Sequence, residues 1–208
     1  MCRALAYLGT PIVLDELLYK PDSSLIIQAY NPKLMTEIRQ NLGGFGMLAW
    51  DDQSEAPKKP FNYRTHLLPF YDDNLVNLSS KIRAYCVLAH IRGVEYNNKT
   101  AVSNQNVHPF LFDNTDLAFA HNGDLEGFEE MRYDLAAYMK PEYRARIKGS
   151  TDTEWMYALF LSMLKPKVKK HTAEDIHQGI IAMLDVIRTV RKDNNIAYSS
   201  SLNFFSHL

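Results

Sequence analysis

The chain has 208 residues, of which 46% are apolar and 12% aromatic, so it is long enough to bury a core and too apolar for disorder. Its formal net charge of −1 gives no strong field that would favour nucleic acid or an anionic membrane surface. Two cysteines are too few for a disulfide framework, no signal peptide opens the chain, and no apolar run approaches the roughly 18 residues that span a bilayer. We therefore expect one domain over residues 1–208, located in the cytoplasm.

The first half of the chain alternates apolar runs with polar segments. Three apolar runs are typical of strands, namely residues 3–8, 47–50 and 85–91. Helical spacing occurs in two segments, residues 23–38, where Asn31-Pro32 interrupts it, and residues 72–82. Loops are predicted for the polar segments 51–60 and 93–107.

The second half begins with a hairpin and continues with helices. Residues 110–112 and 117–120 flank Asp113-Asn114, which predicts two short strands and a turn. N-cap signals at residues 150–154 precede a helix over 155–164, and a second helix is expected over 172–192. Strand-like composition returns at 197–206. Strands before helices, with β-structure at both ends, favour an α+β or layered sandwich fold over a βαβ repeat.

Cys2 is the first candidate for chemistry. Once Met1 is removed, one residue would carry both a thiol and a free α-amino group, whose reference pKa is about 7.7–8.0. That amine can take the thiol proton and later protonate a leaving amine, so a cysteine could act without a paired histidine. An incidental cysteine near a terminus is the alternative. Cys86 is a weaker nucleophile candidate, because it lies inside an apolar strand, where free cysteines are usually inert.

Three further candidates follow at the ends of predicted elements. Arg92 closes an apolar strand and could hold a carboxylate, although it could equally be a surface arginine. Asn122-Gly123 could offer two oxyanion donors, or simply form a turn. Asp152 lies in a first helical turn, where it could bind an ammonium group or cap the helix.

The histidines complete the set of candidates. His108 precedes a predicted strand, and a lone histidine is more often structural than catalytic. His90, His108 and His121 match no compact metal-ligand spacing, so we expect neither a metal nor another cofactor.

The order of these motifs is more specific than any one of them. Met-Cys-Arg, Gly-Gly-Phe-Gly, Ala-His-Ile-Arg, Asn-Val-His-Pro-Phe, Ala-His-Asn-Gly and Ser-Thr-Asp-Thr-Glu follow one another along nearly the whole chain. Together they resemble the class II (N-terminal nucleophile, Ntn) glutamine amidotransferases, above all the small stand-alone YafJ and EgtC-like branch. The resemblance implies a four-layer αββα sandwich, with C-terminal strands that are shortened or absent in this chain.

The resemblance also implies a role for each candidate. Cys2 would be the nucleophile, and Asn122 and Gly123 the oxyanion hole. Arg92 would hold the α-carboxylate of glutamine or a γ-glutamyl group and Asp152 its α-ammonium, with His108 in the same substrate-binding set. Besides its C-terminal end, the sequence departs from the family in two places: Gly43 stands where Asp is frequent, and the turn after Arg92 is altered.

We therefore expect an amidohydrolase that cleaves the γ-amide of glutamine or of a γ-glutamyl compound through a thioester on Cys2. Two alternatives remain open: a glutaminase subunit that delivers ammonia to a separate synthase, and an inactive binding module of the same fold. The expected partner is a small-molecule substrate, without nucleic acid or membrane. The sequence leaves a homo-oligomer open.

Overall fold

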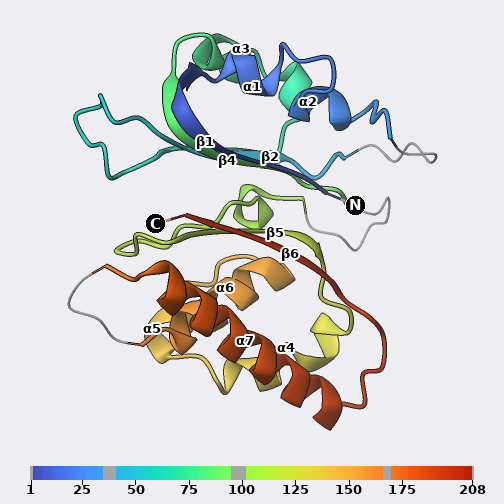
Figure 1. The fold of residues 1–208 in the computed structure, drawn as a ribbon. Helices are drawn as coiled ribbons and strands as arrows, with labels where there is room; N and C mark the ends of the chain where they lie inside the picture. Colours follow the sequence, from blue (N-terminus) through green and yellow to red (C-terminus); the bar gives the residue numbers. More distant parts are fainter. Residues whose placement is uncertain (1, 35–40, 95–101, 166–169, 208) are drawn as a thin grey trace. The chain divides into compact units, whose positions relative to one another are not determined.

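The computed structural model describes residues 2–34, 41–94, 102–165 and 170–207. These residues form two compact units (Figure 1). The N-terminal unit comprises the described residues up to Asn122 together with Asn203–His207, and the helical unit comprises those of Gly123–Leu202. Each unit is described by itself.

A four-stranded antiparallel sheet forms the centre of the N-terminal unit. Its order is β1 (Arg3–Val13), β4 (Arg83–Ile91), β2 (Phe45–Trp50) and β3 (Phe61–Thr65). The three strands predicted from apolar runs are confirmed, each with a longer span. Strand β3 was not predicted, because it is short, lacks a continuous apolar run and has only Thr65 buried.

The two central strands are buried on both faces, which explains their uninterrupted apolar sequences. Successive side chains of a strand point to opposite faces of a sheet. In β2, Met47 and Ala49 belong to one core cluster, whereas Leu48 and Trp50 belong to a second. Strand β4 divides its side chains between the same two clusters. The four-stranded sheet therefore has one core cluster on each of its two faces.

Three short helices cover the first face, as Figure 1 shows: α1 (Asp15–Leu18), α2 (Leu25–Gln28) and α3 (Asp73–Ser79). Asp72 caps α3 by accepting a hydrogen bond from the Leu75 N–H at 3.2 Å. The helix predicted over 72–82 is thus confirmed, although it ends at Ser79. The segment 23–38 forms a single helical turn in its described part, and its residues 35–40 lie outside the described residues.

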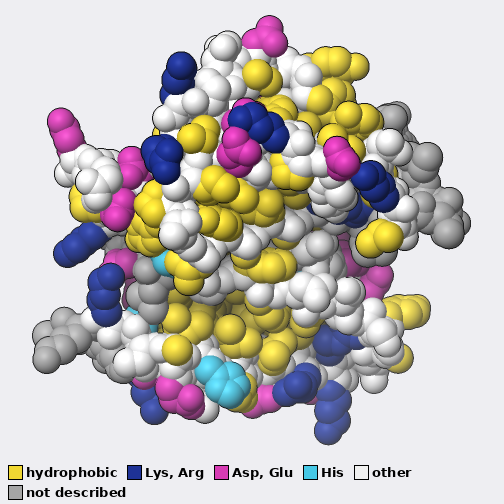
Figure 2. Space-filling view, turned by 45° about the horizontal axis from the view of Figure 1, so that its top comes forward, with side chains coloured by type: hydrophobic (Ala, Val, Ile, Leu, Met, Phe, Trp, Pro, Cys, Tyr) yellow, Lys and Arg dark blue, Asp and Glu magenta, His cyan; other side chains and the backbone are white. Residues whose placement is uncertain are grey.

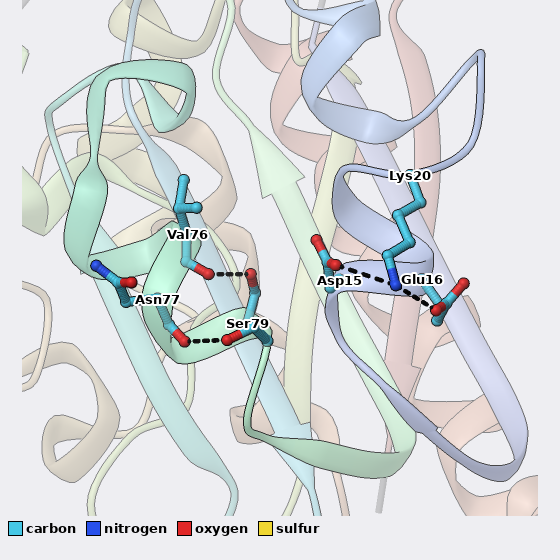
Figure 3. Close-up of polar contacts among 7 residues, drawn as sticks. Asp15, Glu16, Lys20, Val76, Asn77 and Ser79 are labelled. Atoms are coloured by element: carbon cyan, nitrogen blue, oxygen red, sulfur yellow. Dashed lines mark hydrogen bonds and ion pairs between the residues drawn. The ribbon is translucent and has the colours of Figure 1, made fainter.

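Figure 3 shows polar contacts near α1 and within α3. The Lys20 ammonium pairs with Asp15 at 3.3 Å and with Glu16 at 2.6 Å. The Ser79 hydroxyl donates to the Val76 carbonyl at 2.9 Å. Exposed ion pairs of this kind contribute little to stability, so the apolar face of these helices is what holds them on the sheet.

Strands β5 (Ala118–Asp124) and β6 (Ser201–His207) form a two-stranded sheet. Ala118 and Ala120 of β5 pack in the second core cluster with Leu48 and Leu88 of the four-stranded sheet. The predicted strand at 197–206 is confirmed as β6. The predicted hairpin at 110–120 forms in part, through one isolated antiparallel bridge between Phe110 and Phe119.

The helical unit contains α4 (Phe128–Ala136), α5 (Pro141–Arg144), α6 (Asp152–Met163) and α7 (Ala173–Asp193). Both helices predicted here are confirmed as α6 and α7. Thr151 caps α6, and a capping box between Thr172 and Asp175 opens α7. The two helices meet at Gly179, where an added Cβ would lie 2.6 Å from a Leu164 methyl group. Helices α4 and α5 were not predicted.

On the face drawn in Figure 2, acidic and basic side chains are interspersed, and neither forms a continuous patch. This distribution agrees with the formal net charge of −1. Among the described residues, none of the helices has the length and apolar character needed to cross a membrane.

Candidate active site

The start of β1 and the end of β4 bring Cys2 to the segment that follows Arg92. Arg3 pairs with Ile91 in the antiparallel ladder, so the residues just outside this pair are neighbours. The Gly93 N–H donates a hydrogen bond to the Cys2 Sγ at 3.2 Å. The Arg3 guanidinium donates to the Cys2 carbonyl at 2.9 Å. The thiol is therefore held in place by backbone geometry.

Arg92 is fixed by the glycines that precede β2. Its N–H donates to the Gly44 carbonyl at 2.9 Å, and its carbonyl accepts from the Gly43 N–H, also at 2.9 Å. A Cβ at position 43 would lie 2.9 Å from the Arg92 Cγ and 2.7 Å from a methyl group of Val94. A side chain at position 43 would therefore press on the side chains of Arg92 and Val94.

Three buried histidines lie close to one another in this unit: His90 of β4, His108, and His121 of β5. The ring of His90 stacks on that of His108 with a centroid separation of 4.2 Å. The Nδ1 of His108 donates to the carbonyl of His121 at 3.1 Å. Burial lowers the pKa of His90 to about 3 and that of His108 well below its usual value, and the nearby Arg92 charge acts in the same direction. Both rings are therefore neutral at physiological pH.

The arrangement of these histidines is not that of a metal site. Across the described ranges, no group of three His, Cys, Asp or Glu side chains is placed to hold a metal ion.

Asn122 and Gly123 lie near the end of β5, and both are partly buried. The Asn203 amide of β6 donates to the Asn122 carbonyl at 2.8 Å. This cross-strand bond fixes the backbone at Asn122. Asn122 is the last residue of β5 in the N-terminal unit, and Gly123 is the first residue of the helical unit.

Asp152 is the first residue of α6, directly after the Thr151 cap. Its Oδ2 accepts a hydrogen bond from the Leu125 N–H at 2.9 Å, and its Oδ1 accepts from the Thr153 N–H at 2.7 Å. Asp152 therefore holds the backbone two residues after Gly123, within the helical unit. The Asp152 Oδ1 also accepts from the Thr153 hydroxyl at 3.2 Å, so the carboxylate is held by its neighbours on both oxygens.

Glu154 is a residue of this region that the sequence did not single out. Its side chain is buried, and its carboxylate accepts from the Lys148 N–H at 3.0 Å and the Gly149 N–H at 2.6 Å. These bonds fix the turn that leads into Asp152. The signal was present in Thr151-x-x-Glu154, the sequence pattern of a capping box.

The other cysteine differs from Cys2 in its environment. Cys86 is only 5% exposed and packs between the two sheets with Trp50 and Leu88. Burial raises the pKa of the Cys86 thiol to about 11, so it stays protonated at neutral pH. This burial supports the expectation that Cys86 is an inert core residue.

Comparison with known proteins supplies the family. Residues 73–199, more than half of the chain, match the family model described as glutamine amidotransferases class-II. The probable glutamine amidotransferase DUG3 of Saccharomyces cerevisiae is 32% identical over 206 residues, which are 94% of this chain and 56% of the yeast protein. The chain thus spans little more than half the length of this relative.

A solved structure confirms the fold. The glutamine aminotransferase class-II domain protein from Silicibacter pomeroyi superposes with a TM-score of 0.64 at 23% identity, over 99% of this chain and 72% of the other. The expected α+β, Ntn-hydrolase type of fold is therefore confirmed. The family match and the yeast relative establish that this chain belongs to the class-II glutamine amidotransferases.

Proposed function

We propose that the protein hydrolyses the γ-amide of glutamine or of a γ-glutamyl compound through a thioester on Cys2. The observation that carries this proposal is the hydrogen bond from the Gly93 N–H to the Cys2 Sγ, next to Arg92. An N–H donor aimed at sulfur stabilises negative charge there, which a nucleophilic thiolate requires. The same backbone segment carries the guanidinium that would bind the α-carboxylate of the substrate.

The proposed reaction begins after Met1 has been removed. The α-amino group of Cys2 takes the thiol proton, and Sγ attacks the γ-carbonyl carbon of the substrate. The Asn122 side-chain amide and the Gly123 N–H stabilise the oxyanion of the tetrahedral intermediate. The C–N bond then breaks, the leaving amine takes the proton, and water hydrolyses the thioester to release the γ-carboxylate.

Substrate recognition rests on the amino-acid end of the substrate. Arg92 would pair with the α-carboxylate and Asp152 with the α-ammonium. Recognition of the α-amino-acid end would then favour substrates whose amide is γ-linked.

A relative with a defined reaction supports the γ-glutamyl part of the proposal. The gamma-glutamyl-hercynylcysteine sulfoxide hydrolase of Mycolicibacterium smegmatis is 30% identical over 92 residues, which are 44% of this chain and 39% of that protein. Its name describes removal of a γ-glutamyl group from an amine larger than ammonia. The proposed site accordingly binds the γ-glutamyl end and leaves the amine to surrounding loops.

The test combines mass spectrometry with an assay. The mass of the purified protein shows whether Met1 is removed, and glutamate release is measured from glutamine and from γ-glutamyl dipeptides for wild type and Cys2→Ala. We expect Met1 to be absent, wild type to release glutamate, and Cys2→Ala to lose at least 10³-fold in rate, as removal of a nucleophile does. Activity that persists in Cys2→Ala would exclude the mechanism.

The same assay separates the alternatives. Release of glutamate without any added protein supports a stand-alone hydrolase. Release that occurs only with a synthase subunit would make the protein an ammonia-delivering subunit, and binding of glutamate without turnover would make it an inactive module. A cytoplasmic location and a single domain over 1–208 are part of this proposal.

A further inference from the structure

His108 joins two strands that carry the proposed chemistry. Its ring stacks on His90, which lies in β4 two residues before Arg92. Its Nδ1–H bonds to the carbonyl of His121, which lies in β5 one residue before Asn122. One side chain thus contacts both the strand that leads to Arg92 and Gly93 and the strand that carries Asn122.

The backbone around His108 is pressed against the four-stranded sheet. A Cβ at Gly46 would lie 2.1 Å from the His108 carbonyl oxygen, so only glycine fits at this position of β2. Gly46 pairs with His90 across the ladder between β2 and β4. Arg64 of β3, the cross-strand partner of Gly46, donates to the Pro109 carbonyl and lies 5.3 Å from the centroid of the Phe110 ring. The segment from His108 to Phe110 is therefore held on the four-stranded sheet.

The environment of His108 excludes two other roles. Its side chain is buried, with only 4% of the residue exposed, which leaves little surface for direct contact with substrate. The ring is also neutral with its proton on Nδ1, since that atom faces a carbonyl oxygen. A general acid or base would need to exchange a proton with the reacting atoms, and this buried ring, whose pKa burial lowers well below its usual value, is a poor proton acceptor near neutral pH.

We propose that His108 is a positioning residue that fixes the Asn122 end of β5 relative to the Cys2–Gly93 end of the four-stranded sheet. This inference rests on the proposed function, because it assigns Asn122 to the oxyanion hole. The stack holds the His108 ring beside His90 of β4. The hydrogen bond holds the backbone of His121, immediately before Asn122. Without the bond, the Asn122 amide would shift relative to the sulfur, and displacements of about 1 Å at a reacting centre can cost roughly 10²-fold in rate.

Three substitutions separate the ring from the hydrogen bond. His108→Phe keeps an aromatic ring for the stack and removes the donor. His108→Asn places an amide nitrogen near the position of Nδ1, whereas His108→Gln places it near Nε2 and cannot replace the bond. His177→Phe is the control, because His177 is an exposed histidine of α7.

Kinetics are measured per intact site, with Cys2 titrated by the glutamine analogue 6-diazo-5-oxo-L-norleucine. We expect kcat to fall roughly 10- to 100-fold in His108→Phe and His108→Gln, KM to change less than about threefold, and His108→Asn to recover part of kcat. Both limbs of the pH–rate profile should stay, since His108 does not titrate in the working range. An unchanged kcat per titrated site in His108→Phe and His108→Gln, or the loss of a pH limb, would overturn the inference.

An NMR measurement tests the same link without any turnover. Amide signals of Gly93 and Asn122 are compared between wild type and the variants. Both signals should move in His108→Phe and in His108→Gln, and the Asn122 signal should return toward its wild-type position in His108→Asn. If neither moves more than in His177→Phe, the inference fails even in an active enzyme. A wild-type protein without glutaminase activity would instead contradict the proposed function. The NMR comparison would then still show whether His108 holds the Asn122 backbone.

Discussion

The Leu125 N–H donates a hydrogen bond to the Asp152 Oδ2 at 2.9 Å, so the carboxylate proposed to bind the substrate ammonium also holds the chain just after Gly123. This double use predicts different outcomes for two substitutions. Asp152→Asn removes the charge and keeps one of the two acceptor oxygens, so KM should rise roughly 10- to 100-fold and the free energy of unfolding should fall by about 0.5–1.5 kcal/mol. Asp152→Ala should raise KM at least as much and also lower the free energy of unfolding by about 1–3 kcal/mol.

Steady-state kinetics with glutamine and urea unfolding of both variants check this prediction. Asp193→Asn, at the exposed C-terminal end of α7, controls for the change in net charge. A normal KM in Asp152→Asn would remove Asp152 from the ammonium site and leave it a structural role.

Reaction with iodoacetamide should distinguish the two cysteines. Cys2 is partly exposed, whereas Cys86 is buried and its thiol has a pKa raised to about 11. Because the thiolate is the reactive form, native protein at pH 7.5 should be alkylated at Cys2 and spared at Cys86. Peptide mass spectrometry locates the label. The matched variant Cys86→Ala should retain the labelling and the kcat of wild type, and labelling of Cys86 at a similar rate would contradict its burial.

Arg92→Lys should weaken binding more than turnover. Lysine keeps the charge but cannot form the two parallel bonds that a guanidinium makes to a carboxylate. We expect KM for glutamine to rise roughly tenfold or more, with a smaller change in kcat. Arg83→Lys, at an exposed position where the guanidinium bonds to the Pro11 carbonyl, is the control and should leave KM unchanged. A larger change in kcat than in KM would show that Arg92 acts on the reacting atoms.

Alanine substitutions at two glycines should lower stability by different amounts. In Gly46→Ala the new methyl group would lie 2.1 Å from the His108 carbonyl oxygen, which is a backbone atom and cannot rotate away as a side chain can. In Gly9→Ala it would lie 2.8 Å from the hydroxyl at the far end of the Tyr7 side chain, which can rotate away. Thermal unfolding should show a loss of about 1–3 kcal/mol for the first and much less for the second. Equal losses would mean that His108 is not tightly packed on β2.

Acid should destabilise the protein through the buried histidines. The pKa of His90 is lowered to about 3 and that of His108 well below normal in the folded state, while both are near 6.5 when unfolded. Between about pH 6.5 and 3 the unfolded chain binds more protons, so stability falls as pH decreases. Each histidine should contribute a slope of about 1 kcal/mol per pH unit well below pH 6.5.

Urea unfolding between pH 7 and 5 measures that slope. The exposed His177, replaced by Gln, should leave it unchanged, whereas His108→Asn should reduce it. A flat profile over this range would mean that water reaches the histidine stack.

Much of the fold follows from local sequence patterns. The apolar runs of β2 and β4 required strands buried on both faces, and the N-cap signals at Thr151 and Thr172 located α6 and α7. Strand β3 and helices α4 and α5 were missed because they are short or only partly buried. Their stability comes from contacts with distant segments, such as the bond from Tyr63 to Asp72, rather than from their own periodicity.

The sequence by itself determined the set of chemical groups: a cysteine after Met1, Arg92 at a strand end, Asn122-Gly123, and Asp152 in a first helical turn. The tertiary structure decided how these groups are held. The antiparallel register of β1 and β4 places the Gly93 N–H on the Cys2 sulfur, and α6 places Asp152 on the Leu125 N–H. The stack of His90 on His108 joins strand β4 to a residue of the segment that precedes β5. Such relations depend on register and on close packing between segments far apart in the chain, and local periodicity carries no information on either.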